Sequence, residues 1–93
     1  MAPARTVPDL LRARARAEPG AVALVVDGGD PLTYADWDRR SDAAASGLVA
    51  HGTRPGDRIA LLFDNARWTQ YAVAYLAALK AGATAVPLGS RFT

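Results

Sequence analysis

The amino-acid sequence predicts an α/β fold in which helices pack on a mainly parallel sheet. Segments with apolar residues at helical spacing alternate with short, continuous apolar runs that are typical of buried strands. Two of these runs, 58–63 and 83–88, flank one predicted helix, and the unit has the ~30 residues of a right-handed crossover between parallel strands. Because strands that are apolar on both faces need cover on both, we expect packing on each side of the sheet.

Composition limits the class of protein. The 93 residues fit one small domain, and 51% hydrophobic with 22% charged residues is typical of a soluble globular chain. A net charge of +2 does not indicate a nucleic-acid-binding surface. The absence of cysteine excludes disulfides, thiolate metal sites and cysteine nucleophiles. Because the sequence has neither a secretory signal nor an apolar run long enough for a membrane span, we expect a cytoplasmic protein.

The first 33 residues predict a helix followed by two strands. Thr6 can cap a helix whose first turn holds Pro8 and Asp9, and the segment 18–20, with its proline and glycine, ends that helix. The apolar run 21–26 predicts a strand. The Asp, Gly and Pro residues at 27–31 then predict a tight reversal, and 32–33 a short returning strand.

The remaining sequence predicts two further helices, each followed by a turn and a strand. Thr33 repeats the capping pattern, and Gly52 and Gly82 are natural helix stops. One face of the second helix repeats at helical spacing and comprises Tyr34, Trp37, Ser41, Ala44, Ala45 and Leu48. The strand at 58–63 leads into a helix over about 66–81, and the strand at 83–88 follows.

Few residues indicate a chemical site. Neither of the common glycine-rich phosphate-binding motifs occurs. His51 is the single histidine, and its place beside a helix stop predicts a surface residue that is favoured there when protonated. One histidine cannot build a catalytic triad or a metal-binding set. We therefore predict no catalytic residue and no metal site in this chain.

Asn65 and Arg91 are the candidate cofactor-binding residues. Asp64 and Asn65 follow a predicted strand, and in open α/β sheets ligands bind beyond the carboxyl ends of strands. The alternative is that one of these two residues caps the next helix. Arg91 follows the last predicted strand, where it could meet an anion or have a structural role only.

The second helix carries a group of carboxylates that could suggest a metal site. Asp36, Asp38 and Asp42 lie among Arg39 and Arg40, and the spacing scatters them around the helix. The pattern therefore predicts a solvated face.

An aromatic row marks the 66–81 helix. Trp68, Tyr71 and Tyr75 recur at steps of three and four residues. Such a stripe is typical of core packing, with contact to a partner or an acyl chain as the alternative.

Three stretches stand in a characteristic order: TVPDLLRARARAEPGAVALV, LTYADWDRRSDAAASGLVAHGTRPGDRIALLFDN and YLAALKAGATAVPL. In this order they resemble the start of the adenylate-forming superfamily, which includes acyl-CoA and aryl-CoA synthetases, luciferases and the adenylation domains of nonribosomal peptide synthetases. The sequence departs from the family at Gly89, where Asn is common, and at Arg67, where an acidic residue is frequent. The resemblance implies that residues 1–93 are the incomplete N-terminal part of an AMP-binding domain, a partial subdomain of an adenylate-forming enzyme.

The resemblance also implies an ATP-dependent ligase of the acyl-CoA synthetase type. A carboxylate attacks the α-phosphate of ATP, with Mg²⁺ present, to give an acyl-adenylate and pyrophosphate. A thiol of coenzyme A or of a carrier pantetheine then takes the acyl group. The family's phosphate loop, acid pocket, ribose-binding aspartate and C-terminal lysine come later in the chain, so no catalytic residue is carried over. We expect the chain alone to be inactive and to hold no cofactor.

Two hypotheses of different class follow. The first is the N-terminal segment of an acid-activating ligase, structural and not catalytic alone, whose partner is the remainder of the enzyme or a complementary chain. Its motivation is that the sequence ends at Thr93, where a further family helix would begin. The second is a freestanding ligase-derived α/β module that binds a partner protein or forms a homo-oligomer through uncovered sheet edges and apolar faces. A minimal nucleotide-binding domain is a third.

Overall fold

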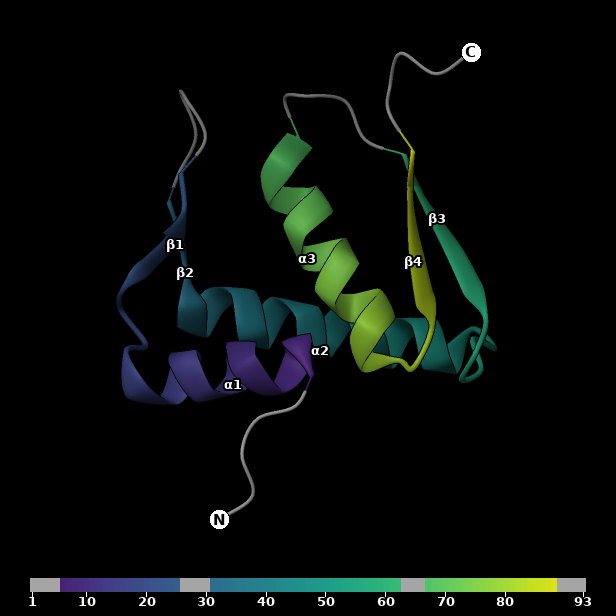
Figure 1. Ribbon diagram of the computed structural model, residues 1–93, viewed down its shortest axis with the longest axis horizontal. Helices are drawn as coiled ribbons and strands as arrows, with labels where there is room; N and C mark the ends of the chain where they lie inside the picture. Colours follow the sequence, from purple (N-terminus) through teal and green to yellow (C-terminus); the bar gives the residue numbers. More distant parts are fainter. Residues whose placement is uncertain (1–5, 26–30, 63–66, 89–93) are drawn as a thin grey trace.

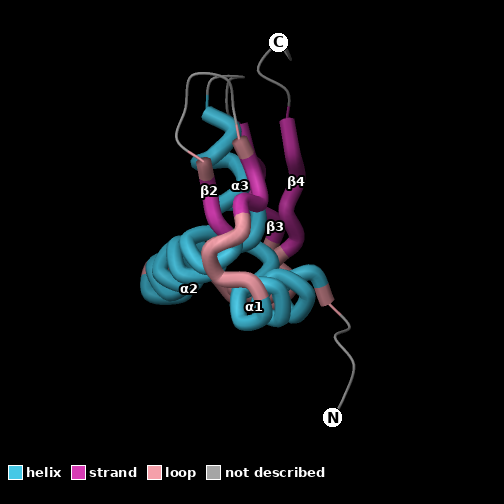
Figure 2. The backbone as a smooth tube through the Cα atoms, turned by 90° about the vertical axis from the view of Figure 1, so that its left-hand side faces the viewer, coloured by secondary structure: helices cyan, strands magenta, loops and turns pink. Residues whose placement is uncertain are grey.

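The computed structural model describes residues 6–25, 31–62 and 67–88. Within these ranges the elements are α1 (Val7–Ala17), β1 (Val22–Leu24), β2 (Leu32–Thr33), α2 (Tyr34–Ala50), β3 (Arg58–Leu62), α3 (Trp68–Lys80) and β4 (Thr84–Leu88). α1 and α2 lie across the base of the molecule, and α3 rises from this base between the two strand pairs (Figure 1). Seen from the side, the strands and α3 stand on the same side of α1 and α2 (Figure 2).

Side-chain caps begin two of the helices, as the sequence predicts. The Thr6 hydroxyl accepts a hydrogen bond from the Asp9 amide at 3.1 Å, and the Thr33 hydroxyl accepts one from the Asp36 amide at the same distance. These bonds satisfy amide groups that the first turn of a helix leaves without partners. After α3, Gly82 takes a φ of +81°, in the left-handed region that favours glycine, and the chain turns into β4.

The described strands form two separate pairs rather than one sheet. β3 and β4 are parallel, in register from Arg58 opposite Thr84 to Leu62 opposite Leu88, and α3 connects them. The predicted crossover unit is thus confirmed. β1 and β2 form a short antiparallel pair, so only one of the two pairs is parallel. The strand predicted over 21–26 is shorter in the structure, where β1 spans Val22–Leu24. Residue 26 lies outside the described ranges.

The β3–β4 pair has one covered face. α3 packs against both strands, and Leu61 on the covered side is only 5% exposed. Leu62 points to the opposite face, because side chains alternate along a strand, and it is 62% exposed. Its cross-strand neighbour Leu88 is 39% exposed. The expected cover on both faces is therefore missing here, since no described segment packs over Leu62 and Leu88.

The core lies where α2 meets α3. Ser41 and Ala45 of α2 are buried, which confirms the predicted inner face, and Ala45 packs with Ala77 of α3 and with Ala81, which follows α3. The Ser41 hydroxyl donates to the carbonyl of Trp37 at 2.7 Å, so the one fully buried polar side chain in the described ranges has a partner. The contact surfaces of these helices are small side chains, which allow the two backbones to approach closely.

Candidate functional site

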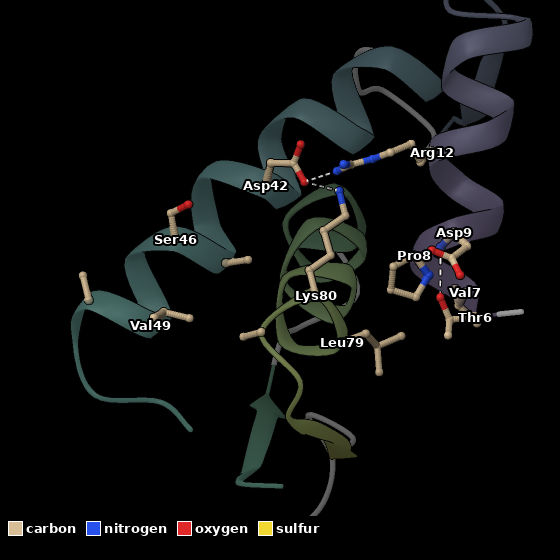
Figure 3. Close-up of a pocket in the computed structure, with 13 residues that line it drawn as sticks. Thr6, Val7, Pro8, Asp9, Arg12, Asp42, Ser46, Val49, Leu79 and Lys80 are labelled. Atoms are coloured by element: carbon tan, nitrogen blue, oxygen red, sulfur yellow. Dashed lines mark hydrogen bonds and ion pairs between the residues drawn. The ribbon is translucent and has the colours of Figure 1, made fainter. Parts of the chain in front are cut away.

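An open groove of about 1120 Å³ separates α1 from the ends of α2 and α3. The first turn of α1, from Thr6 to Asp9, forms one wall, and Ser46 and Val49 of α2 form the opposite wall (Figure 3). Charged side chains reach into it from all three helices. Both apolar and charged side chains line this groove, which is a common composition for a ligand site.

Four charged side chains form what we call the Lys80 cluster: Arg12, Asp42 and Lys80, which line the groove, and Asp38 beside it. The Lys80 ammonium donates to Asp38 Oδ1 at 2.6 Å, to the Asp38 carbonyl at 2.9 Å and to Asp42 Oδ1 at 2.7 Å. Arg12 donates to the same Asp42 oxygen at 2.7 Å, and its Nε lies 3.6 Å from Asp38 Oδ2. Figure 3 shows the Arg12 and Lys80 side chains converging on the Asp42 carboxylate.

The Lys80 cluster is electrically neutral, and two of its side chains are more deeply buried than the other two. Two cations alternate with two carboxylates, so no net charge remains for a ligand. The exposed fractions of the Lys80 and Asp38 side chains are 8% and 17%, whereas those of Arg12 and Asp42 are 44% and 49%. Burial of Asp42 acts to raise its pKa, but the hydrogen bond from Lys80 and the positive charges of Lys80 and Arg12 outweigh it and hold the pKa below the usual 3.8.

The prediction of a solvated acidic face is wrong for Asp38. Asp38 and Asp42 are four residues apart, so they share one face of α2, and that face meets Lys80 of α3. Asp36 lies elsewhere on the helix and bonds Arg39 at 3.0 Å. The i, i+4 spacing was a signal that the sequence offered. Its cationic partner could not be identified from that spacing, because it comes from another helix.

The candidate ligand contacts of the sequence are not placed by the structure. Asp64, Asn65 and Arg91 lie outside the described residues. α3 begins at Trp68 with Arg67 at the N-cap position and without a side-chain capping bond. The roles of Asn65 and Arg91 therefore stay predictions.

His51 and the aromatic row are placed away from the Lys80 cluster. His51 is exposed at the end of α2, as predicted, and its Nδ1 lies 2.9 Å from the Gly47 carbonyl oxygen. Trp68 and Tyr71 meet edge to face with ring centroids 5.3 Å apart, and Tyr71 stacks on Tyr75 at 6.2 Å. Trp68 is 48% exposed, so the row forms a partly exposed ridge on α3 rather than the core that the sequence predicts.

The chemistry open to the described residues is limited. They contain no group of three or more His, Cys, Asp or Glu side chains that could hold a metal ion. Both cations of the Lys80 cluster are bound to carboxylates, so neither is available to a phosphate group. The Lys80 cluster therefore does not fit an ATP or Mg²⁺ site. None of the helices in the described ranges is long and apolar enough to cross a membrane.

Comparison with known families gives a match over most of the chain. The family described as AMP-binding enzyme matches residues 11–93. The L-proline–[L-prolyl-carrier protein] ligase of Streptomyces coelicolor is 49% identical over 61 residues, which cover 66% of this chain and 11% of that protein. The medium-chain fatty-acid–CoA ligase of Escherichia coli is 40% identical over 80 residues, 86% of this chain and 14% of that ligase. The feruloyl-CoA synthase of an Amycolatopsis species is 47% identical over 78 residues, 84% and 15% respectively. The chain thus spans 11–15% of the length of these relatives.

Solved structures with the same fold include parts of larger enzymes. The N-terminal subdomain of NpsA from Klebsiella oxytoca aligns with a TM-score of 0.85 at 29% identity, covering 94% of this chain and 22% of that one. The fatty acid AMP ligase of Legionella pneumophila aligns with a TM-score of 0.80 at 32% identity, covering 92% of this chain and 15% of the ligase.

Proposed function

This chain belongs to the AMP-binding enzyme family, and we propose that it forms the N-terminal segment of an ATP-dependent ligase that activates a carboxylic acid. In this proposal residues 1–93 are an incomplete part of the AMP-binding domain, structural and not catalytic alone. The complete enzyme makes an acyl-adenylate and passes the acyl group to a thiol. The names of the relatives support this reaction class, since they include a carrier-protein ligase, a CoA ligase and a CoA synthase. They also support coenzyme A or a carrier-bound pantetheine as the acceptor.

The observation that carries the proposal is the open face of the β3–β4 pair. Leu62 and Leu88 are cross-strand neighbours on that face, at the carboxyl ends of two parallel strands, and both are exposed. Parallel sheets are usually covered on both faces, because burial of their apolar side chains stabilises the fold. We propose that the remainder of the enzyme, or a complementary chain, covers this face.

ATP and Mg²⁺ are assigned to the complete enzyme rather than to this segment. The Lys80 cluster fits neither group, because its two cations are bound to its own two carboxylates. The segment would contribute by holding β3 and β4 in place through α3. A cytoplasmic location stays a prediction of the sequence.

A chimeric enzyme tests this role. The 80-residue segment of the Escherichia coli medium-chain fatty-acid–CoA ligase that matches this chain is replaced by the corresponding residues of this chain. Formation of acyl-CoA from a medium-chain fatty acid is then measured. We expect the chimera to be active and the same ligase with the segment deleted to be inactive. A chimera that folds with an unchanged circular dichroism spectrum and forms no acyl-CoA would contradict the proposal.

A matched pair of substitutions in the chimera tests the covered face. Leu62→Asp places a carboxylate on the apolar face and should abolish acyl-CoA formation, because a charge would be buried against the rest of the enzyme without a partner. Ala13→Asp places the same group at an exposed position of α1 and should leave the activity unchanged. Equal activity of the two variants would show that the Leu62 face is not buried in the enzyme.

The same exposed face favours a second function, a freestanding module that self-associates. Two copies could cover each other at Leu62 and Leu88. Sedimentation velocity at micromolar concentration separates the two functions. A stable dimer that Leu62→Asp dissociates would support the module, and a monodisperse monomer would exclude self-association.

A further inference from the structure

Only a small apolar surface holds α1 on the fold. Of its eleven residues, Leu11 and Ala15 are buried, whereas Val7 and Leu10 remain 50% and 54% exposed. α1 packs against α2 and also contacts α3. The apolar contact of α1 therefore rests on two side chains, and its other contacts to α2 are polar.

Those polar contacts are exposed to solvent. Arg12 reaches Asp42 at 2.7 Å and Asp38 at 3.6 Å, with 44% of the Arg12 side chain exposed. Arg14 lies over the Tyr34 ring, 5.2 Å from its centroid, and is also exposed. Exposed ion pairs such as those of Arg12 contribute little to stability and are screened by salt.

The other half of the Lys80 cluster is built differently. Lys80 is 8% exposed and holds both Asp38 and Asp42 from α3. These bonds do not pass through Arg12, although Arg12 and Lys80 share the Asp42 Oδ1 atom. If Arg12 withdraws, the carboxylates of α2 stay bound to α3. The cluster therefore divides into an inner link between α2 and α3 and an outer link to α1.

From this division we propose that α1 is a releasable strap. It opens at the Arg12 contacts as a unit, while Lys80 keeps α2 and α3 together. Opening removes the α1 wall of the groove and uncovers the surface under Leu11 and Ala15.

Amide hydrogen exchange of the full 93-residue chain tests the strap. Exchange of α1, α2 and α3 is followed at ~0.01 M and ~1 M NaCl, where screening lengths differ about tenfold. We expect the higher salt to accelerate exchange in α1 by up to about fivefold, the factor expected of exposed ion pairs, and to leave the core of α2 and α3 unchanged.

A matched pair of variants separates the Arg12 link from a general effect of charge. Arg12→Met should accelerate α1 exchange to a similar extent and remove most of its salt dependence. Arg16→Met makes the same change on the same helix, at an exposed arginine without an ion pair to any described residue, and should leave both unchanged. Arg12→Lys should restore part of the protection.

Two results would overturn the strap. One is acceleration of α1, α2 and α3 together, which would make α1 part of a single cooperative unit. The other is an α1 exchange rate that neither salt nor Arg12→Met alters. The salt titration uses the unaltered chain, so it decides the question even if a variant fails to fold.

Discussion

At the scale of single residues, Lys80 is the side chain on which most of the polar structure converges. It is the single lysine of the sequence, and three oxygen atoms of α2 lie within 2.9 Å of its ammonium group. A buried cation is tolerated only when such partners replace the water that it loses. Removal of Lys80 would leave two carboxylates four residues apart with only a half-exposed arginine between them.

We therefore expect Lys80→Met to lower the free energy of unfolding by about 2–4 kcal/mol, since one partner of a buried ion pair is lost while the apolar stem is kept. Arg12→Met, at the exposed end of the same cluster, should cost at most about 1 kcal/mol. Urea denaturation of the two variants and the unaltered chain measures both values. Equal losses for Lys80→Met and Arg12→Met would show that the burial of Lys80 does not matter.

The pH dependence of stability should reveal Asp42. Its pKa is lowered in the folded chain, because the bonds and charges of Lys80 and Arg12 outweigh the opposing effect of burial. A lowered pKa gives stability that is fully present above the unfolded-state value and lost as the pH falls through the folded-state value. Stability should therefore be flat near neutrality and decline as the pH drops below 3.8, the unperturbed value.

Asp42→Asn identifies the source of that decline. The variant should be less stable than the unaltered chain at pH 7 and should lose less stability on acidification, because Asn cannot be protonated in this range. A residual decline is expected from Asp36, whose pKa the hydrogen bond from Arg39 lowers. Thermal unfolding across the acidic range measures both curves. Curves that stay parallel down to the lowest pH would exclude Asp42 as the group that titrates.

The Lys80 cluster could not be predicted from the sequence. Asp42 and Lys80 are 38 residues apart, and no local pattern pairs them. Helical spacing places Asp38 and Asp42 on one face of α2, but it does not say which helix that face meets. The interpretation of scattered carboxylates is wrong for this pair because residues four apart lie on one face of a helix, and here a second helix covers that face.

At the scale of elements, local signals were sufficient. Both threonine caps, the glycine after α3 and the parallel pairing of β3 with β4 follow from the sequence and are confirmed. Burial of the strands was not predictable in the same way. An apolar run such as that of β3 indicates that both faces of the strand are buried in the complete protein. It does not indicate whether the burying residues belong to the same 93-residue segment. Leu62 is an example, because it belongs to an apolar run and is nevertheless exposed in this structure.

The turn after α3 can be tested with a matched pair of glycines. Gly82→Ala should cost about 1–2 kcal/mol, because its φ of +81° lies in the left-handed region that an L side chain rarely adopts. Gly47→Ala lies inside α2 with no heavy atom within 4 Å of the new Cβ and should stabilise the chain by about 0.5–1 kcal/mol. Urea denaturation gives both values, and effects of the same sign would contradict the turn geometry.

At the scale of the whole molecule, the chain combines a well-connected core with an uncovered surface. α2 and α3 meet through small buried side chains, and the Lys80 cluster links all three helices. On the far side, the apolar Leu62 and Leu88 face solvent. Stable packing beside an unsatisfied apolar face is the arrangement expected of a structural segment within a larger enzyme.

The proposal that this segment is structural and not catalytic alone is tested most directly by ATP–pyrophosphate exchange on the isolated 93-residue chain. The purified chain is incubated with ATP, Mg²⁺ and labelled pyrophosphate in the presence of fatty, aryl or amino acids. A segment that is structural and not catalytic alone should give no exchange above a protein-free blank with any of them. Saturable, acid-dependent exchange by the isolated chain would contradict it.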